Sequence, residues 1–162
     1  MIKDSGERRS FESGGVRDIQ DGKGRCDLLP LDCVAGLLNE TSEMAHDVLN
    51  NIGMYQETGD TAYIYAAISI FIENTYNDFY TAILEVALHY EEGAKKYAER
   101  NWQLGLPQHC FIDSGVRHFL KWCRGDDDER HDRAFIWNML GAVWTAEHKK
   151  DLKCYPIDEK FM

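Results

Sequence analysis

The sequence predicts an all-α protein, a bundle of four or five helices, and three observations support this. Apolar residues recur at helical spacing over much of residues 30–150, no segment carries a convincing strand pattern, and the alanine content and length of residues 61–101 favour helix. The chain has 162 residues, 44% of them hydrophobic and only 3 of them prolines, which suffices for one domain with a real core. We expect a single domain with an irregular basic arm (1–29), a helical bundle (30–150) and a loose tail (151–162).

The first half of the bundle is punctuated by Pro30 and by the segment "QETGD". Pro30 suits the first turn of a helix, and residues 31–55 then carry a rough 3.6-residue spacing until "QETGD" breaks it. Asp60 or Thr61 can cap the next helix. Residues 61–101 form either one long helix or two helices that meet near "ENTYND".

The second half of the bundle contains two further predicted helices. The segment "WQLGLPQH" is typical of a loop, residues 110–124 predict a helix, and "GDDDE" predicts a turn. Residues 131–150 predict the last helix, with bases at its C-terminal end as the helix dipole prefers.

Charge and cysteine content narrow the class of protein. The net charge of −10 argues against nonspecific nucleic-acid binding. Residues 1–25 hold six Lys/Arg, whereas residues 26–94 hold none against twelve Asp/Glu. We favour a solvated acidic surface, and the alternative is an acidic region that attracts divalent cations beside a basic region that holds phosphate.

Nothing in the sequence indicates secretion or a membrane. No apolar run reaches the roughly 18 residues of a membrane helix. The start, "MIKDSGERRS", has no apolar stretch, and five scattered cysteines without a CxxC pair fit reduced thiols. We expect a cytoplasmic protein.

The stretch "HYEEGAKKYAERNW" (89–102) joins an apolar stripe to a charged face. On a helical wheel Glu91 lies on the flank of the stripe, so it either engages a ligand or forms a plain salt bridge with Lys95. The expected stripe is Ile83, Ala87, Tyr90, Ala94 and Tyr97, and the expected exposed face is Glu85, Glu92, Lys96 and Glu99.

Later polar residues leave alternatives open. Asp113 shares a helix face with Arg117 and is either an N-cap or a catalytic acid. His118 fits a hydrogen-bonded core histidine as well as a functional one. Asn138 lies among apolar neighbours, where a buried amide needs partners. The loop "DGKGR" has the glycine spacing and basic tips that can wrap a phosphate, without the spacing of a P-loop.

Four blocks, "GVRDIQDGKGRCDLLP", "EEGAKKYAERNWQLGLP", "FIDSGVRHFLKW" and "WNML", together resemble the phage-type dATP/dGTP diphosphohydrolase family in its N-terminal domain. They cover roughly residues 8–31 and 84–145. That family is similar in function to the all-α MazG-like nucleotide pyrophosphohydrolases, so the resemblance implies a MazG-like bundle. It also implies a homo-oligomer, for which residues 61–90 are the candidate interface, and a location in the cytoplasm, the host's if a phage encodes the chain.

The resemblance implies hydrolysis of a deoxypurine nucleoside triphosphate to the monophosphate and pyrophosphate. The implied cofactor is Mg²⁺, with Mn²⁺ as the alternative, held by carboxylates while Lys and Arg stabilise the leaving group. The residues it suggests for catalysis are Glu91, Asp113 and His118, and those for the metal are Glu91, Glu92 and Asp113. Those for substrate binding are Lys23, Arg25, Lys96, Tyr97, Asn101, Trp102, Arg117, His131 and Asn138.

The sequence also departs from the family pattern. Ala98 replaces the usual glycine, Ala134 replaces a second histidine, and the ExxE…ExxD metal signature of MazG-like enzymes is not cleanly present. The alternative function is therefore a catalytically inactive protein that sequesters a nucleotide signal. A third possibility is an interaction module whose acidic middle serves oligomerisation.

Overall fold

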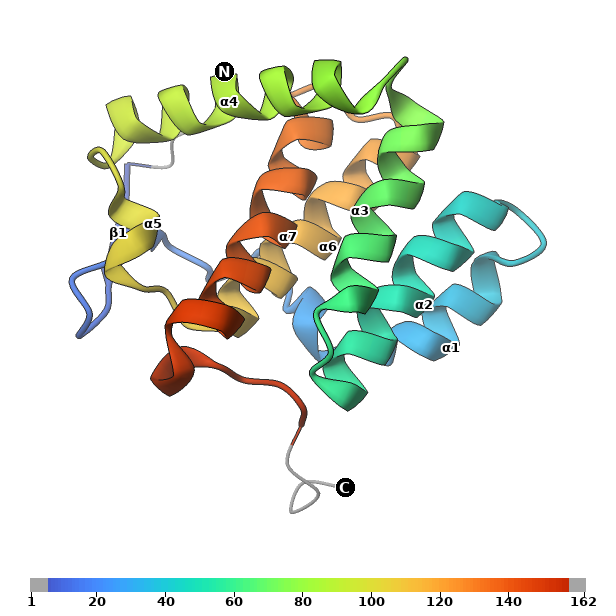
Figure 1. The fold of residues 1–162 in the computed structure, drawn as a ribbon, viewed down its shortest axis with the longest axis horizontal. Coiled ribbons are helices and arrows are strands. Elements are labelled where there is room, and N and C mark those ends of the chain that lie inside the picture. The colour runs from blue at the N-terminus through green and yellow to red at the C-terminus, as the bar shows by residue number, and fades with distance from the viewer. Residues whose placement is uncertain (1–5, 158–162) are drawn as a thin grey trace. The chain divides into compact units, whose positions relative to one another are not determined.

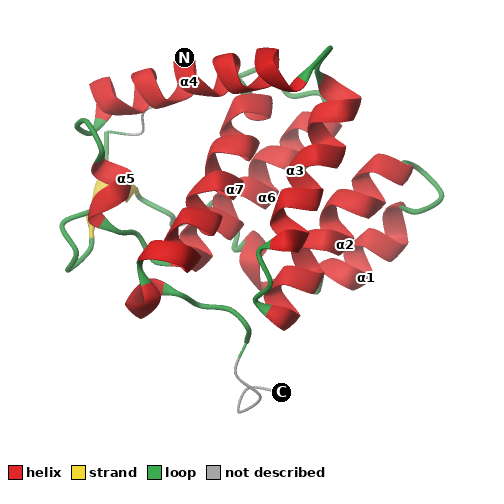
Figure 2. Ribbon diagram, viewed as in Figure 1, coloured by secondary structure: helices red, strands yellow, loops and turns green. Residues whose placement is uncertain are grey.

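The computed structural model describes residues 6–157, whose regular secondary structure is helical apart from one small two-stranded sheet (Figures 1 and 2). The all-α prediction is confirmed. Within the described residues, no helix is both long and apolar enough to cross a membrane. The helices are α1 (Leu31–Leu38), α2 (Glu43–Thr58), α3 (Ala62–Thr75), α4 (Phe79–Lys96), α5 (Asn101–Leu104), α6 (Gln108–Arg124) and α7 (His131–His148), with 3-10 turns at Cys26–Leu28 and Lys150–Leu152.

The chain divides into two compact units. One consists of the residues up to Asp27 together with Ile83–Lys153, and the other of Leu28–Ala82 together with the residues from Cys154. Helix α4 passes from the second unit into the first.

In the second unit, the expected run 31–55 is two helices. The chain leaves α1 at Leu38, and Ser42 then accepts a hydrogen bond from the backbone N–H of Ala45 at 3.1 Å, which starts α2. The N-cap Ser42 therefore marks a break between two helices that could not be seen from the spacing of the apolar residues. Helix α2 ends at Gly59, whose φ of 69° is the left-handed conformation of a helix C-cap.

Residues 61–101 contain a helix break near "ENTYND", so the two-helix alternative is confirmed. Tyr76 adopts extended backbone, and the Asp78 carboxylate accepts hydrogen bonds from the N–H of Thr81 at 2.8 Å and from its hydroxyl at 2.7 Å. These bonds lower the pKa of Asp78. Asp60 accepts from the N–H of Ala62 at 2.9 Å, as expected of a cap before α3.

The N-terminal arm is more ordered than the sequence predicts. Strands β1 (Arg8–Ser10) and β2 (Val16–Asp18) pair antiparallel, with Arg9 opposite Arg17. Three-residue strands are too short to show alternation, so their pairing was not detectable from pattern alone.

The expected loose tail is ordered at its start. Tyr155 is buried, packs edge-on against Tyr55 at a ring distance of 5.5 Å and accepts a hydrogen bond from Gln56 at 3.4 Å. The rest of the predicted tail, residues 158–162, lies outside the described residues.

Helices α6 and α7 form an antiparallel pair at close range in the first unit (Figure 1). A Cβ on Gly141 would lie 2.3 Å from the Phe111 ring, and a Cβ on Gly115 would lie 2.2 Å from the Met139 methyl. The Gln108 amide donates to the carbonyl of Ala142 at 2.9 Å. The absence of two side chains therefore sets the separation of these helices.

Replacing Gly141 with Ala tests this contact. The added methyl must displace the buried Phe111 ring, so we expect a loss of about 1–3 kcal/mol in the free energy of unfolding, measured by urea denaturation. The control is Gly36→Ala in α1, where a Cβ meets nothing within 4 Å. That change should stabilise its helix by up to about 1 kcal/mol. Equal effects of the two substitutions would contradict the proposed close packing.

Candidate functional site

A cavity of about 530 Å³ lies within the first unit. Its lining comes from both strands and the loop after β2, from the C-terminal half of α4 and the segment after it, and from α5, α6 and α7. Blocks that are far apart in the sequence thus meet in one place.

The lining of this cavity is strongly cationic. It contains seven basic side chains against two carboxylates, in a protein whose net charge is −10. Such a concentration of one sign favours an anionic ligand with several charges. The bases are Arg9, Arg17, Lys23, Lys96, Arg100, Arg117 and Lys121, and the acids are Asp18 and Glu129.

Arg17 on β2 has an unused donor in the cavity wall. One guanidinium nitrogen, Nη2, donates to the Asn138 side chain at 2.9 Å, while Nη1 is buried and has no hydrogen-bond partner among the described residues. The guanidinium lies over the rings of Phe111 at 5.1 Å and Trp137 at 5.7 Å. Burial lowers the pKa of Arg17, although an arginine stays protonated. A buried cationic donor with no acceptor suits an oxygen-rich anion.

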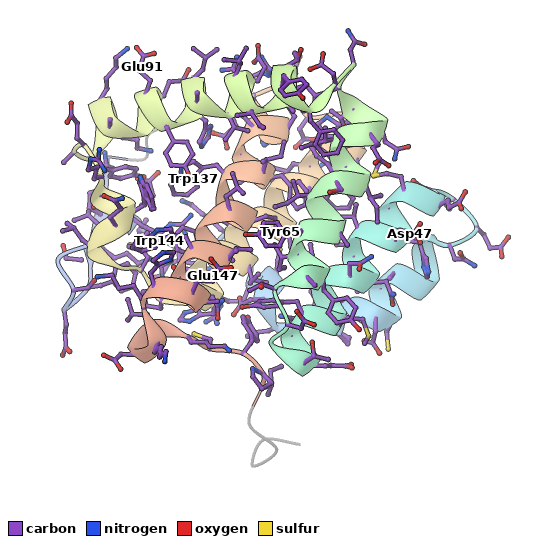
Figure 3. All side chains as sticks on the ribbon, viewed as in Figure 1. Asp47, Tyr65, Glu91, Trp137, Trp144 and Glu147 are labelled. Atoms are coloured by element: carbon purple, nitrogen blue, oxygen red, sulfur yellow. The ribbon has the colours of Figure 1, made fainter. Side chains whose placement is uncertain are left out.

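Aromatic rings form another part of the wall. Tyr90 lies 5.6 Å from Trp102 and 5.9 Å from Trp137, measured between ring centroids. Trp102 also packs edge-on against Trp144 at 5.0 Å. Trp144 and Trp137 both belong to α7 (Figure 3), and Trp144 is not among the lining residues. The Tyr90 ring is tilted by 69° to that of Trp102 and by 59° to that of Trp137, so a planar ligand can stack on the face of one ring while the edge of another contacts it.

The basic loop of residues 20–26 is held in place by α6. The buried Asp113 carboxylate accepts from the N–H of Cys26 at 2.7 Å and from Arg117 at 2.5 Å. Arg117 also donates to the carbonyls of Lys23 at 3.2 Å and Gly24 at 2.9 Å. The Lys23 ammonium lines the cavity with no ion-pair partner among the described residues. Asp113 thus anchors the loop that presents Lys23, and the alternative of an N-cap is wrong because α6 begins at Gln108.

Asp18 organises the opposite side of the cavity. Its carboxylate accepts from Lys96 at 2.7 Å and from the Tyr97 hydroxyl at 3.0 Å, and it pairs with Arg8 at 3.0 Å. The side-chain amide of Asn101 forms two hydrogen bonds with the backbone of Val16. It donates to the Val16 carbonyl and accepts from the Val16 N–H, each at 2.9 Å. These contacts fix β2 against the end of α4 and the start of α5.

Two histidines and a glutamate meet at the α6–α7 end of the cavity. The Nδ1 atoms of His118 and His131 are 2.9 Å apart, and Glu129 Oε1 lies 3.4 Å from the former and 3.9 Å from the latter. Burial, together with the neighbouring His131, lowers the pKa of His118 well below its usual value and keeps that ring neutral. His118 and Glu129 line the cavity, while His131 is buried behind them.

Most of the expected substrate-binding residues are brought together. Lys23, Lys96, Tyr97, Asn101, Trp102, Arg117 and Asn138 line the cavity, as does the expected catalytic residue His118. His131 contacts the lining through His118. Arg25 is different because its guanidinium is paired with the buried Asp27 at 2.5 Å.

The expected metal set Glu91, Glu92 and Asp113 is not brought together. Among the described residues, two groups have His, Cys or carboxylate ligand atoms within 4.8 Å of one another, namely His118–Glu129–His131 and Asp126–Asp128–His131. Glu91 points outward from α4, 57% exposed, in an ion pair with Lys95 (Figure 3). The plain salt bridge is therefore the arrangement found. Glu92 lies 3.9 Å from Arg133.

The expected stripe on α4 is partly wrong. Ile83 is 61% exposed, whereas Val86 is buried and Glu85, expected outside, pairs with Arg133 and with Arg130 at 3.2 Å. Tyr90, Ala94 and Tyr97, which were expected on the apolar stripe, line the cavity. A helix that faces a polar cavity and solvent has no single apolar stripe, so the wheel misplaced its N-terminal half.

Sequence reasoning missed Arg17, Asp128 and Glu129. Arg17 lies in a segment without a detectable helical or strand period. Asp128 and Glu129 lie in "GDDDE", for which the sequence predicts a turn and no functional role. The sequence feature that could have revealed these acids is their position directly before His131, which follows a helix that carries His118.

Together the fold and the lining define an α-helical protein with a cationic cavity that is walled in part by aromatic rings. The model of the family described as "dATP/dGTP diphosphohydrolase, N-terminal" matches residues 56–154, more than half of the chain. The chain belongs to this family. The match includes the three later blocks and not residues 8–31. No curated protein and no solved structure matches the chain.

The half-buried His89 of the cavity wall should make stability depend on pH. Burial, and next to it the charge of Arg133, lowers the pKa of His89 to about 4. The unfolded chain, with a histidine pKa of about 6.5, takes up this proton first as the pH falls. The contribution of neutral His89 is thus complete above about pH 6.5 and is lost between pH 6.5 and 4.

Thermal melts between pH 4 and 8 of the wild type and of His89→Gln test this. The difference in melting temperature between the two proteins should shift in favour of the variant as the pH falls. The exposed His148→Gln serves as control. A difference that does not change with pH would contradict the burial of a neutral His89.

Proposed function

We propose that this protein hydrolyses a deoxypurine nucleoside triphosphate to the monophosphate and pyrophosphate. The observation that carries the proposal is the cavity, which combines an excess of five positive charges with a wall of aromatic rings. The family description supplies the reaction class and the two candidate bases, adenine and guanine.

The two kinds of lining suggest how the substrate lies. The purine stacks on one of the rings of Tyr90, Trp102 and Trp137, since base–aromatic stacking contributes about 1–3 kcal/mol per base. The phosphates extend toward Lys23, Arg117 and Lys121. A triphosphate carries about four negative charges, which these bases and Arg17 neutralise.

The proposed reaction calls for a divalent ion, and the lining of the cavity fits one. His118, Glu129 and His131 offer three ligand atoms in one place, and they would hold it. When bound, the ion polarises a phosphoryl oxygen and lowers the pKa of a water molecule. The protein's own contribution is electrostatic: Lys23 and Arg117 stabilise the charge that develops on the leaving pyrophosphate.

A catalytically inactive, nucleotide-sequestering protein is the alternative function. It uses the same cavity and predicts tight binding without product. The side-chain cluster at the phosphate end supports hydrolysis, because a protein that only binds needs no ligand set of this kind.

Incubation with each deoxynucleoside triphosphate and Mg²⁺ or Mn²⁺, followed by measurement of monophosphate and pyrophosphate, tests the proposal. Product is expected from dATP or dGTP. Lys23→Ala should lower kcat/KM by about 10²-fold, as the loss of one charged donor does. Trp102→Ala should lower it by about 10-fold or more through lost stacking. Tight nucleotide binding without product from any substrate would establish the sequestering alternative instead.

Glu91→Gln and Lys95→Ala provide the matched controls. Both residues lie in the exposed ion pair of α4 and outside the cavity. We expect turnover within about twofold of the wild type, because screened surface pairs contribute little. Loss of turnover in Glu91→Gln alone would restore Glu91 as a candidate metal ligand.

We also propose that the protein forms a homo-oligomer through α4. Ile83, Leu84 and Leu88 lie on one face of that helix and are 61%, 70% and 43% exposed. Exposed apolar side chains gathered on one face favour association. Light scattering after size exclusion should give a multiple of the 18.7 kDa chain mass and a smaller species for Leu84→Glu. Leu37→Glu, on the exposed face of α1, is the control and should leave the mass unchanged.

A further inference from the structure

We propose that His118, Glu129 and His131 form a resident transition-metal site, of the class that takes Zn²⁺, Mn²⁺, Fe²⁺ or Co²⁺, and that Mg²⁺ enters only with the phosphates of the substrate. The role of this ion in hydrolysis rests on the proposed function. Its binding to the protein does not.

The spacing of the three ligand atoms fits a first-row ion. His118 Nδ1, His131 Nδ1 and Glu129 Oε1 form a triangle with sides of 2.9, 3.4 and 3.9 Å. The point equidistant from these corners lies about 2.0 Å from each, which is the length of a zinc–nitrogen bond. Ca²⁺, with bonds of about 2.3–2.6 Å, would lie out of the plane of these atoms, and its preference for six to eight oxygen ligands argues against this set.

The identity of the ligands argues against Mg²⁺ as the resident ion. Mg²⁺ binds oxygen and keeps several waters, whereas two of these three ligands are imidazole nitrogens. Imidazole favours the later divalent ions of the first transition row. A set of two histidines and one carboxylate also leaves coordination positions open, as a catalytic site requires.

A second carboxylate orients the buried histidine. His131 uses Nδ1 toward His118 and Glu129, while its Nε2 lies 2.8 Å from Asp128 Oδ1. A ligating histidine commonly donates its other ring N–H to a carboxylate, which fixes the tautomer and makes the free nitrogen more basic. With Nε2 carrying the proton, Nδ1 of His131 presents its lone pair to the ion.

The site opens on the proposed phosphate end of the cavity. His118 and Glu129 line the cavity beside Lys121 and Arg117, and His131 is 2% exposed behind them. The open coordination positions therefore face the cavity. A direct hydrogen bond between two neutral imidazoles is the competing explanation of the 2.9 Å contact, and it predicts no affinity for a metal ion.

Titration of the chelator-treated full chain with Co²⁺ tests the proposal. We expect one Co²⁺ per chain, read from visible d–d absorption and calorimetry, with Mg²⁺ unable to displace it at equal concentration. Glu129→Gln and His118→Asn should abolish the spectrum. Asp128→Asn should weaken binding by about 10- to 100-fold through the lost orienting bond. Circular dichroism verifies that each variant is folded.

His148→Ala on the same helix is the matched control, because this histidine is exposed and lies outside the cluster. It should bind Co²⁺ like the wild type. Absence of Co²⁺ binding by the wild type, or an equal loss in His148→Ala, would overturn the site. Hydrolysis of dATP or dGTP by protein that binds no Co²⁺ would refute the proposed metal site and support the proposed hydrolase function. Stoichiometric Co²⁺ binding without hydrolysis of any nucleotide would support the site and refute the function.

Discussion

The close approach of α6 and α7 is the constraint on which the candidate site depends. Gly141 admits the Phe111 ring and Gly115 admits Met139, so the two helices pack with little between them. Where the pair ends, at the turn of residues 125–130, the same separation leaves 2.9 Å between the nitrogens of His118 and His131. A wider pair would hold these rings apart, and Arg17 would lose its place beside Phe111 and Asn138.

The charged residues around the cavity have two roles: carboxylates hold the N-terminal arm in place, and cations remain available for a ligand. Asp18, Asp27 and Asp113 are used as anchors: each accepts from basic or backbone donors and fixes a segment of the N-terminal arm. Within residues 6–157, Lys23 and the Nη1 atom of Arg17 have no such partners. Keeping cations together in this way is unfavourable without a ligand, and a polyanion relieves the repulsion. The cavity therefore has a positive potential although the whole chain has a net charge of −10.

Features that depend on residues close together in the sequence could be predicted, whereas features that depend on distant contacts could not. The helices at residues 108–124 and 131–148 carry clear spacing and a strong turn between them, so their positions were predictable. The block resemblance suggested Lys23, Trp102 and Arg117 for substrate binding and His118 for catalysis, and the four residues line one cavity. The arm was not predictable, because β2 is held by the distant side chain of Asn101 and not by its own pattern. Glu91 illustrates the same limit: the wheel cannot separate a flanking ligand from an exposed partner of Lys95.

A crystal structure with a non-hydrolysable dATP or dGTP analogue and Mn²⁺ tests the central claim most directly. The account predicts a purine against Trp102 and Trp137, phosphates beside Lys23 and Arg117, and an anomalous peak within bonding distance of His118, Glu129 and His131. A nucleotide bound outside this cavity, or a manganese peak on Glu91 with none at the histidines, would contradict it.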